Sequence, residues 1–370
     1  MSSLDATVNL GLKATRRLGS LHKPLLRLFR RRARQREHLE FKRQAADVDR
    51  ELARLAAGTG PIIAGPWLAE VGYEVLYWIP FLRWFQDAYG VPRERLVAVS
   101  RGGLEAAYRD IALRYVDLFD LVTPEELGAG NAGRRAEREG GGQKQSSVSA
   151  FDDELIQGAR ARAGAGDATV LHPSLMFRLF RHVWHGNLPL DLLWTHVRHT
   201  RTPAPAARLA GLPDDYVAVK FYGGPALAMT DATRAAVRSL VAHAATLAPV
   251  VVLDTDLPVD EHRDFDLRGI PGVSFLGTRL TPRHNLGTQI ETIAGARFFL
   301  GTCGGLAWLA PFLGIPTVAV YDDDRLLTSH LLVARQAGTR VGAAEFAALD
   351  LRALARTGLL NPPAMAPRIE

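Results

Sequence analysis

A strand–turn–helix–strand unit at residues 298–322 constrains the fold of this chain more than any other feature. An apolar strand leads into a Gly-rich turn over 301–305, an apolar helix follows until Gly314 and Pro316 stop it, and 317–321 is a β-branched strand. Small residues in such a turn let a ligand approach the backbone, and the first N–H groups of the helix attract an anion. The unit therefore predicts a phosphate or diphosphate site, and a tight turn without a ligand is the alternative.

The same residues resemble a known family. Residues 301–310 read Gly-Thr-Cys-Gly-Gly-Leu-Ala-Trp-Leu-Ala, and residues 313–317 read Leu-Gly-Ile-Pro-Thr. Together they resemble the donor-binding segment of GT-B glycosyltransferases. The closest likeness is to the bacterial heptosyltransferase-like branch, in which a Gly-(Ser/Thr)-x-x-Gly turn opens a helix and a Gly-x-Pro-Thr strand follows. The resemblance implies a nucleotide-sugar site at this turn.

A second segment supports the resemblance from the other half of the chain. In heptosyltransferase-like enzymes the first strand is followed by Gly-Asp and then by a helix with a Pro and a Leu-Arg pair. Here Gly72 and Glu74 precede Pro80, Leu82 and Arg83 in a similar layout. The acid is a Glu two residues after the glycine, which departs from the family pattern.

The implied fold class is α/β, with two Rossmann-like, doubly wound domains facing a cleft and a basic helical N-terminal extension. Alternating strands and helices independently predict parallel sheets covered on both faces. We expect the extension over 1–59, an acceptor domain over 60–200, a linker over 201–215 and a nucleotide-sugar-binding domain over 216–370. The Gly-rich, charged stretch at about 128–149 predicts a mobile loop.

Three local predictions complete this outline. Apolar spacing predicts a helix over 104–115 and a weak strand near 118–122. A helix over 350–357 is expected to pack back on the first domain.

The donor site is expected beyond the carboxyl ends of the second domain's strands, where open parallel sheets bind ligands. Lys220 ends the first of these strands and would neutralise diphosphate charge, with Tyr222 just after it; a solvated surface lysine is the alternative. Thr302, Gly304 and Gly305 would supply hydroxyl and backbone donors to the same group.

The helix before the Gly-rich turn adds further donor candidates. Arg283, Asn285 and Gln289 can contact the ribose, base or phosphate of a nucleotide, although Asn285 can equally cap the helix. Glu291 lies where the resemblance implies a ribose-binding carboxylate, and a solvated helix face is its alternative.

Glycosyl transfer needs a base that takes the proton of the attacking hydroxyl. Glu74 and Glu70, after the first strand, are the candidates, and the choice between them stays open. Glu74 can instead favour a helix N-terminus electrostatically. His172, at the end of a strand, is a further candidate base with a structural role as its alternative.

Three aromatic residues, Trp67, Tyr73 and Trp78, can offer a sugar an aromatic face or belong to the core. The single cysteine, Cys303, excludes an internal disulfide, and no His/Cys spacing indicates a metal. The acidic run 322–324 reads as a polar loop at the cleft edge. We therefore expect neither a metal nor a cofactor besides the nucleotide-sugar substrate.

The positive charge is concentrated at the N-terminus. Residues 1–60 hold 14 Lys and Arg against six Asp and Glu, whereas the whole chain holds 45 against 39. A near-neutral remainder argues against a nucleic-acid partner. The basic, leucine-containing stretch 18–36 predicts contact with an anionic membrane surface, or a solvated arm. Five apolar residues with heptad spacing then predict packing on the domain or on a second subunit: Phe41, Ala45, Val48, Leu52 and Leu55.

These features predict a cytoplasmic enzyme without a membrane-spanning segment or signal peptide. If residues 18–36 contact a membrane and are not a solvated arm, the enzyme is peripheral on the inner face of the cell membrane. The resemblance implies a metal-independent, inverting glycosyltransferase. It would transfer a sugar from a nucleotide sugar to a glycan or lipid-linked hydroxyl acceptor in cell-surface polysaccharide or lipid-linked glycan synthesis. A nucleotide-sugar epimerase of the same fold and a non-catalytic GT-B-like binding protein are the alternatives.

Overall fold

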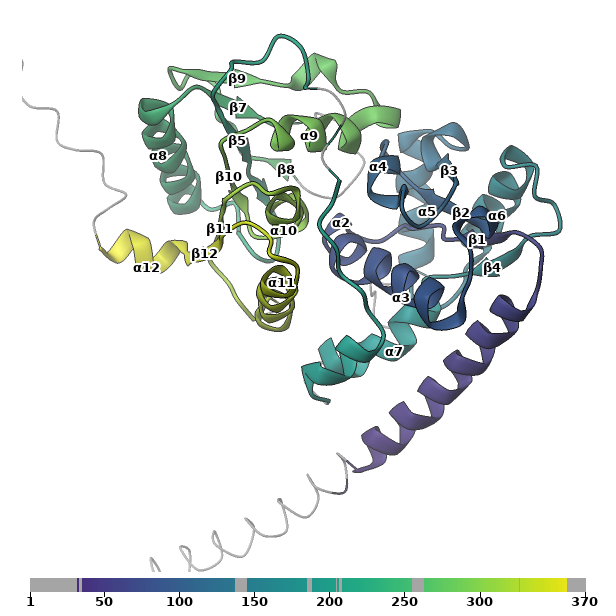
Figure 1. Ribbon diagram of the computed structural model, residues 1–370. Helices are drawn as coiled ribbons and strands as arrows, with labels where there is room; N and C mark the ends of the chain where they lie inside the picture. The colour runs from purple at the N-terminus through teal and green to yellow at the C-terminus, as the bar shows by residue number, and fades with distance from the viewer. Residues whose placement is uncertain are drawn as a thin grey trace, which may run out of the picture.

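Two parallel β-sheets, each with helices packed around it, form the two halves of the protein (Figure 1). The computed structural model describes residues 32, 35–136, 145–184, 188–203, 205, 208–254, 263–325 and 327–357.

The first sheet has the strand order β3-β2-β1-β4, and all of its strands are parallel. The strands are β1 (Ile62–Ala64), β2 (Leu96–Ser100), β3 (Arg114–Asp117) and β4 (Thr169–Leu171). All residues of β1 and β2 are buried, as continuous apolar runs are in sheets covered on both faces. The helices of this domain are α2 (Val71–Tyr73), the π-helical η1 (Glu74–Trp78), α3 (Ile79–Tyr89), η2 (Arg93–Arg95), α4 (Glu105–Tyr108), η3 (Leu118–Asp120), α5 (Pro124–Ala136), α6 (Ala150–Arg162), α7 (Ser174–Trp184) and η4 (Leu190–Thr195).

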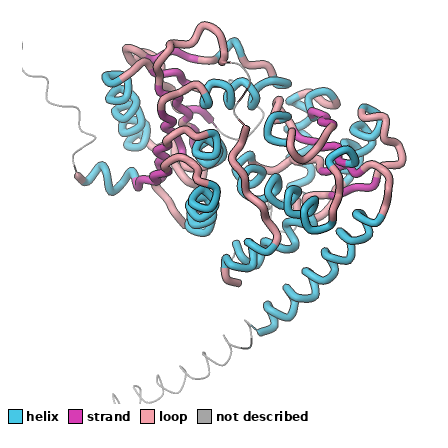
Figure 2. The backbone as a smooth tube through the Cα atoms, viewed as in Figure 1, coloured by secondary structure: helices cyan, strands magenta, loops and turns pink. Residues whose placement is uncertain are grey.

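The second sheet has the strand order β12-β11-β10-β5-β7-β9 and is also parallel throughout. In Figure 2 the strands of this half are magenta and the helices beside them are cyan. Its strands are β5 (Val217–Lys220), β7 (Val250–Val252), β9 (Val273–Phe275), β10 (Phe298–Thr302), β11 (Thr317–Tyr321) and β12 (Phe346–Asp350); β6 (Tyr222–Gly223) and β8 (Arg263–Asp264) form a separate antiparallel pair. The helices are α8 (Asp231–Leu247), η5 (Gly277–Arg279), η6 (Pro282–His284), α9 (Asn285–Ala294), α10 (Gly305–Leu309), η7 (Ala310–Leu313), α11 (Thr328–Val341) and α12 (Leu351–Arg356).

The predicted fold class is confirmed, because both halves are parallel sheets enclosed by helices and the N-terminal segment is helical over residues 35–57. Phe41, Val48 and Leu52 of that helix are buried in the first domain's core, with Ala45 and Leu55 partly buried beside them. The heptad-spaced residues thus pack on their own domain, and the second-subunit alternative does not account for them. Most of the stretch 18–36 lies outside the described residues.

Several local predictions were wrong. Residues 128–136, expected in a mobile loop, belong to α5, where Leu127 packs into the core. Gln145, at the other end of that stretch, is fully buried and hydrogen-bonds to the loop after β1. Residues 137–144 lie outside the described part of the chain.

The segment after β2 was also misassigned. The helix expected over 104–115 is the short α4, and the strand expected near 118–122 is β3, four residues earlier. Here pairing with β2 decides the structure, because the register places Val116 beside Val99 in the sheet. The last described helix, α12, packs on α8 and β12 through the buried Leu351, not on the first domain.

Candidate active site

The second sheet has a topological switch point between its two central strands, β5 and β10. The chain continues from β5 to β7 and β9 on one side, and from β10 to β11 and β12 on the other. Ligands of open α/β sheets bind outside the carboxyl ends of the strands at such a point. Lys220 and Thr302 are the last residues of these two strands. The structure therefore brings the predicted residues Lys220, Tyr222, Thr302, Gly304 and Gly305 together at the switch point.

Thr302 holds the start of β6 against the Gly-rich turn. Its hydroxyl accepts a hydrogen bond from the Tyr222 N–H and donates one to the Tyr222 carbonyl, both at 2.9 Å. The Tyr222 ring lies over Gly304, where a Cβ atom would come 2.1 Å from the Tyr222 hydroxyl oxygen. Since the one proton of the Thr302 hydroxyl is already donated, this group can bind a phosphate only after exchanging partners.

Lys220 is paired with a carboxylate that sequence reasoning did not single out. Its Nζ lies 2.8 Å from each carboxylate oxygen of Asp264, in β8, and Lys220 is only 9% exposed. Asp264 comes close because β8 pairs with β6, a contact between distant segments that the local sequence does not indicate. An incoming diphosphate must therefore share Lys220 with Asp264 or displace it.

The N-terminal end of α9 is arranged differently from the expectation. His284 is the N-cap residue, so Asn285 does not cap this helix, and the Asn285 carbonyl oxygen Oδ1 instead accepts a 2.6 Å hydrogen bond from Gln289 Nε2. Both residues are buried, and Gln289 Oε1 has no partner in the described part of the protein. Glu291 lies half-buried on the same helix. Donor binding by these residues stays a prediction.

Arg283 connects the two domains. It lies 2.8 Å from Asp120, in η3 of the first domain, and 3.3 Å from Asp117, the last residue of β3. The N–H of Gly287 donates to the Gly102 carbonyl at 2.9 Å in the same region. Arg283 therefore joins the two halves in this conformation, and its predicted contact with a nucleotide remains a prediction.

Glu74 lies in the π-helical segment η1, and π segments inside helices occur frequently at functional sites. It has no exposed surface, and its Oε1 accepts hydrogen bonds from the hydroxyl groups of Ser100 and Tyr108. Burial raises the pKa of Glu74 to about 7, although these two hydrogen bonds and Arg101 oppose the shift. Oε2 has no hydrogen-bond partner among the described residues. A carboxylate with these properties can accept a proton near neutral pH.

The other two candidate bases have different surroundings. Glu70 is exposed and directly precedes α2. The first residue of α2, Val71, lies at the Gly-rich turn, because a Cβ atom added to Gly305 would come 3.3 Å from the Val71 Cβ. His172 is buried, with Nε2 3.2 Å from Asp152 and Nδ1 accepting the Ser174 N–H at 3.1 Å. Both ring nitrogens of His172 are therefore engaged inside the first domain.

The domains meet most closely where α2 crosses α10. A Cβ on Gly72 would lie 2.6 Å from the Trp308 ring and 3.3 Å from the Gly305 nitrogen. Trp67 and Trp78, considered as sugar platforms, are instead fully buried in the core, where their rings stack 5.9 Å apart. The Gly-rich turn thus lies directly against the loop and helix that carry the candidate acids Glu70 and Glu74.

Sequence reasoning missed His330, on α11. Its Nε2 lies 2.9 Å from the Tyr73 hydroxyl, and its Nδ1 lies 2.6 Å from the Tyr77 hydroxyl. The His330 ring also contacts Trp184 and Trp308, so side chains of both domains enclose it. The spacing of Tyr73 and Tyr77, one helical turn apart, was the available signal, but nothing in the sequence indicates their partner.

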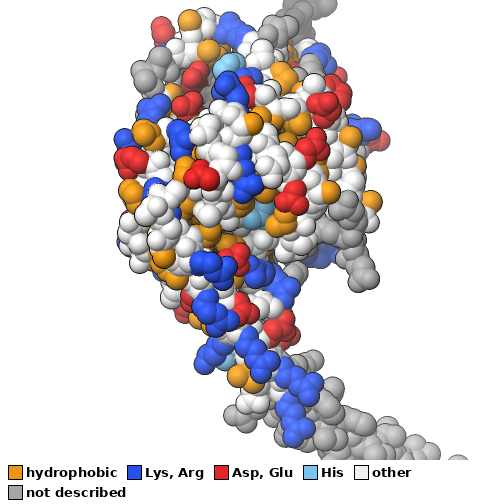
Figure 3. Space-filling view, turned by 90° about the vertical axis from the view of Figure 1, so that its right-hand side faces the viewer, with side chains coloured by type: hydrophobic (Ala, Val, Ile, Leu, Met, Phe, Trp, Pro, Cys, Tyr) orange, Lys and Arg blue, Asp and Glu red, His pale blue; other side chains and the backbone are white. Residues whose placement is uncertain are grey.

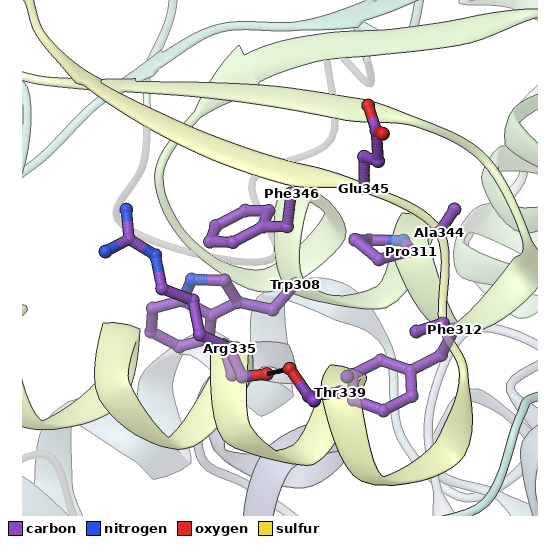
Figure 4. Close-up of a pocket in the computed structure, with 11 residues that line it drawn as sticks. Trp308, Pro311, Phe312, Arg335, Thr339, Ala344, Glu345 and Phe346 are labelled. Atoms are coloured by element: carbon purple, nitrogen blue, oxygen red, sulfur yellow. Dashed lines mark hydrogen bonds between the residues drawn. The ribbon is translucent and has the colours of Figure 1, made fainter.

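A cavity of about 360 Å³ lies in the second domain, lined by residues of α10, η7, α11 and the start of β12 (Figure 4). Trp308 and Phe346 lie at one end beside Arg335, and Phe312 and Thr339 lie at the other (Figure 4). None of the predicted donor-binding residues lines it.

The remaining chemical candidates are buried or bonded to neighbouring residues. Burial raises the pKa of the Cys303 thiol to about 12, which agrees with a packing role in the turn. Asp322 accepts the Ala228 N–H, and Asp323 pairs with Arg325. Within the described ranges, no three His, Cys, Asp or Glu residues are grouped to hold a metal ion. None of the helices in those ranges has the length and apolar character that a membrane crossing requires.

No protein-family model matches the chain, and no curated protein matches it. Its structural neighbours include several glycosyltransferases and a putative UDP-N-acetylglucosamine 2-epimerase from Listeria monocytogenes, which is 10% identical over 84% of this chain and 99% of that chain, with a TM-score of 0.35. Escherichia coli heptosyltransferase WaaC with ADP is 16% identical over 81% of this chain and 99% of that chain, with a TM-score of 0.39. A family 9 glycosyltransferase from Veillonella parvula is 11% identical over 82% and 90% of the two chains, with a TM-score of 0.43.

The iron-containing dodecameric glycosyltransferase TibC from enterotoxigenic E. coli is 14% identical over 71% of this chain, with a TM-score of 0.38. The present chain spans 58% of TibC. The neighbours include GT-B glycosyltransferases of the heptosyltransferase type, as the sequence resemblance implies. At these identities the similarity concerns the fold and does not assign a substrate.

Proposed function

We propose that this protein is a glycosyltransferase that transfers a sugar from a nucleotide-sugar donor to a hydroxyl acceptor. One observation carries the proposal: the Gly-rich turn lies at the switch point of the second sheet and packs against the helix start that bears Glu70 and Glu74. If the turn binds the donor diphosphate and one of these glutamates is the base, the two would meet at the same contact between the domains.

In this proposal, the backbone N–H groups of the turn bind the donor diphosphate, and Lys220 stabilises the charge of the leaving group. Glu74 takes the proton of the acceptor hydroxyl at Oε2, because its raised pKa suits a base near neutral pH. Its burial means that neighbouring residues must move before an acceptor reaches it. Glu70, already exposed beside the turn, is the alternative base.

The finer assignments are proposals as well. By the sequence resemblance, the reaction is metal-independent and inverting, and the product belongs to cell-surface polysaccharide or lipid-linked glycan synthesis at the inner face of the membrane. Arg283, Asn285, Gln289 and Glu291 would contact the nucleotide.

The donor site is tested by thermal-shift measurements with nucleoside diphosphates and nucleotide sugars, with and without EDTA. We expect one nucleotide family to raise the melting temperature in EDTA, and Lys220→Met to abolish that shift while Lys220→Arg retains part of it. Asp264→Asn controls for the loss of the ion pair itself and should keep the shift, since it leaves the cation in place. No shift with any nucleotide would contradict the diphosphate site, and a shift that requires a divalent metal would contradict metal independence.

The base is tested by sugar transfer in Glu74→Gln and Glu70→Gln variants with the identified donor. General-base catalysis is worth about 10²–10⁴-fold in rate, so the variant of the true base should lose that much kcat while the other retains near-normal activity. Full activity in both variants would argue against either glutamate. Conversion of the donor to an epimer without any acceptor would identify the epimerase alternative.

A further inference from the structure

The N-terminal helix has a second ordered face, opposite the one that packs on the first domain. Arg36, Leu39, Arg43, Arg50 and Arg54 follow one another at intervals of three, four or seven residues, so they lie along one side of the helix. At about 1.5 Å per residue, this line is about 27 Å long. The buried Phe41, Val48 and Leu52 lie on the opposite side. We call these five residues the arginine face.

The arginine face is exposed and carries excess positive charge. Arg36, Arg43 and Arg54 are exposed, and the ion pairs of the described residues include none of them. Arg50 pairs with the carboxylate of Asp47. Figure 3 shows Lys and Arg side chains gathered at the lower end of the molecule, around this helix.

The acidic side chains beside the face are largely neutralised by the first domain. Glu40 pairs with Arg181, and Glu51 pairs with Arg178, both of α7. These contacts neutralise two of the acids, and Arg50 neutralises Asp47, so the charges of Arg36, Arg43 and Arg54 remain in excess on the outward side. An apolar residue, Leu39, stands on this cationic side with 58% of its surface exposed.

We propose that the arginine face binds an anionic lipid surface, with the arginines at the headgroups and Leu39 inserted between them. A straight helix with cationic residues and an exposed leucine on the same side fits the boundary between headgroups and acyl chains. The face adds a membrane contact to the one expected from residues 18–36, on residues that the structure describes. Because the helix packs on the first domain, this contact would hold the proposed acceptor domain at the membrane.

This inference adds to the proposed function and is tested without it, since vesicle binding requires no reaction. The experiment measures cosedimentation of the full chain with phosphatidylcholine vesicles, with and without phosphatidylglycerol. We expect binding only to the anionic vesicles and weaker binding at high salt, because salt screens exposed charges. Equal binding to both vesicle types, or none to either, would overturn the proposal.

A matched pair of variants localises the contact. R36Q/R43Q/R54Q removes three charges from the arginine face, and R109Q/R162Q/R356Q removes three exposed arginines elsewhere. Since one basic residue near an anionic membrane is worth about 1 kcal/mol, the first variant should bind about 100-fold more weakly and the second nearly as wild type. Equal losses would mean that net charge alone attracts the protein, and an unaffected first variant would place the contact in residues 1–31.

Two further measurements separate lipid from other polyanions. Leu39→Ser keeps the charge and should weaken vesicle binding several-fold at high salt, where insertion contributes most; unchanged binding would overturn the insertion of Leu39. Duplex DNA should compete poorly with the vesicles. Preferential DNA binding that R36Q/R43Q/R54Q abolishes would overturn the lipid assignment in favour of nucleic acid.

Discussion

The carboxyl group of Glu74 is the most constrained ionisable group in the proposed site. Burial raises its pKa to about 7, against an ordinary value of 4.5. The folded state therefore holds the proton more tightly than the unfolded state, so unfolding releases a proton between these two pH values. The contribution of Glu74 to the free energy of unfolding is most favourable below pH 4.5, falls as the pH rises, and is fully lost above about 7.

This residue-scale effect predicts how Glu74→Gln behaves. The neutral amide keeps the shape of the side chain without the penalty for burying a charge, so at pH 8 the variant should be more stable by up to about 3 kcal/mol. The difference should shrink toward pH 4.5. Chemical denaturation of both proteins across this pH range measures it, and a pH-independent difference would mean that Glu74 does not titrate in this range.

Activity supplies a second residue-scale prediction. If Glu74 is the base, kcat should fall tenfold per pH unit below about 7, because only the ionised carboxylate accepts a proton. The rate-against-pH profile of Glu70→Gln should keep this acidic limb. If kcat of the wild-type protein instead falls only near pH 4, an exposed carboxylate such as Glu70 would be favoured as the base.

At the scale of elements, the crossing of α2 and α10 depends on Gly72. A Cβ at this position would come 2.6 Å from the Trp308 ring, so Gly72→Ala should destabilise the domain contact by about 1–3 kcal/mol. Gly133→Ala is the control, because Gly133 lies in helix α5 with nothing within 4 Å of its would-be Cβ. Thermal unfolding should show a loss for the first variant and no loss for the second.

The N-terminal helix gives a second comparison between elements. Leu52 is fully buried against the first domain, whereas Leu39 is 58% exposed on the same helix. Leu52→Ala should lower the free energy of unfolding by about 2–5 kcal/mol, and Leu39→Ala should change it by less than about 0.5 kcal/mol. Similar values for both variants would mean that the helix is not docked in solution as described.

At the scale of the whole molecule, His330 joins the domains through Tyr73 and Tyr77. His330→Phe keeps a ring of comparable size but removes the hydrogen bonds that His330 makes with the Tyr73 and Tyr77 hydroxyl groups. We expect a loss of about 1–3 kcal/mol in stability and a larger radius of gyration by small-angle scattering. His243→Phe, on the exposed side of α8, is the control and should leave both quantities unchanged.

The fold and the location of the site could be predicted because they depend on local patterns. The apolar runs Leu96–Ser100 and Val217–Lys220 are strands of parallel sheets, and the glycines at 301–305 form the turn that begins α10. Strand ends and helix starts are set by neighbouring residues, so the sequence alone predicts Lys220 and Thr302 at the same edge of the second sheet. The segment 128–136 was misread because composition alone does not reveal that Leu127 packs into a core.

The sequence by itself determined the alternation of strands and helices, the Gly-rich turn and the heptad spacing of the N-terminal helix, all of which follow from residues close together in the chain. Only the tertiary structure decided the partners of the candidate residues. Lys220 pairs with Asp264, Glu74 accepts a hydrogen bond from Ser100, and Tyr73 is hydrogen-bonded to His330. In each case the partner comes from a distant segment of the chain. Such pairs form because folding brings remote segments into a water-poor interior, where a buried polar group must find a partner or change its protonation.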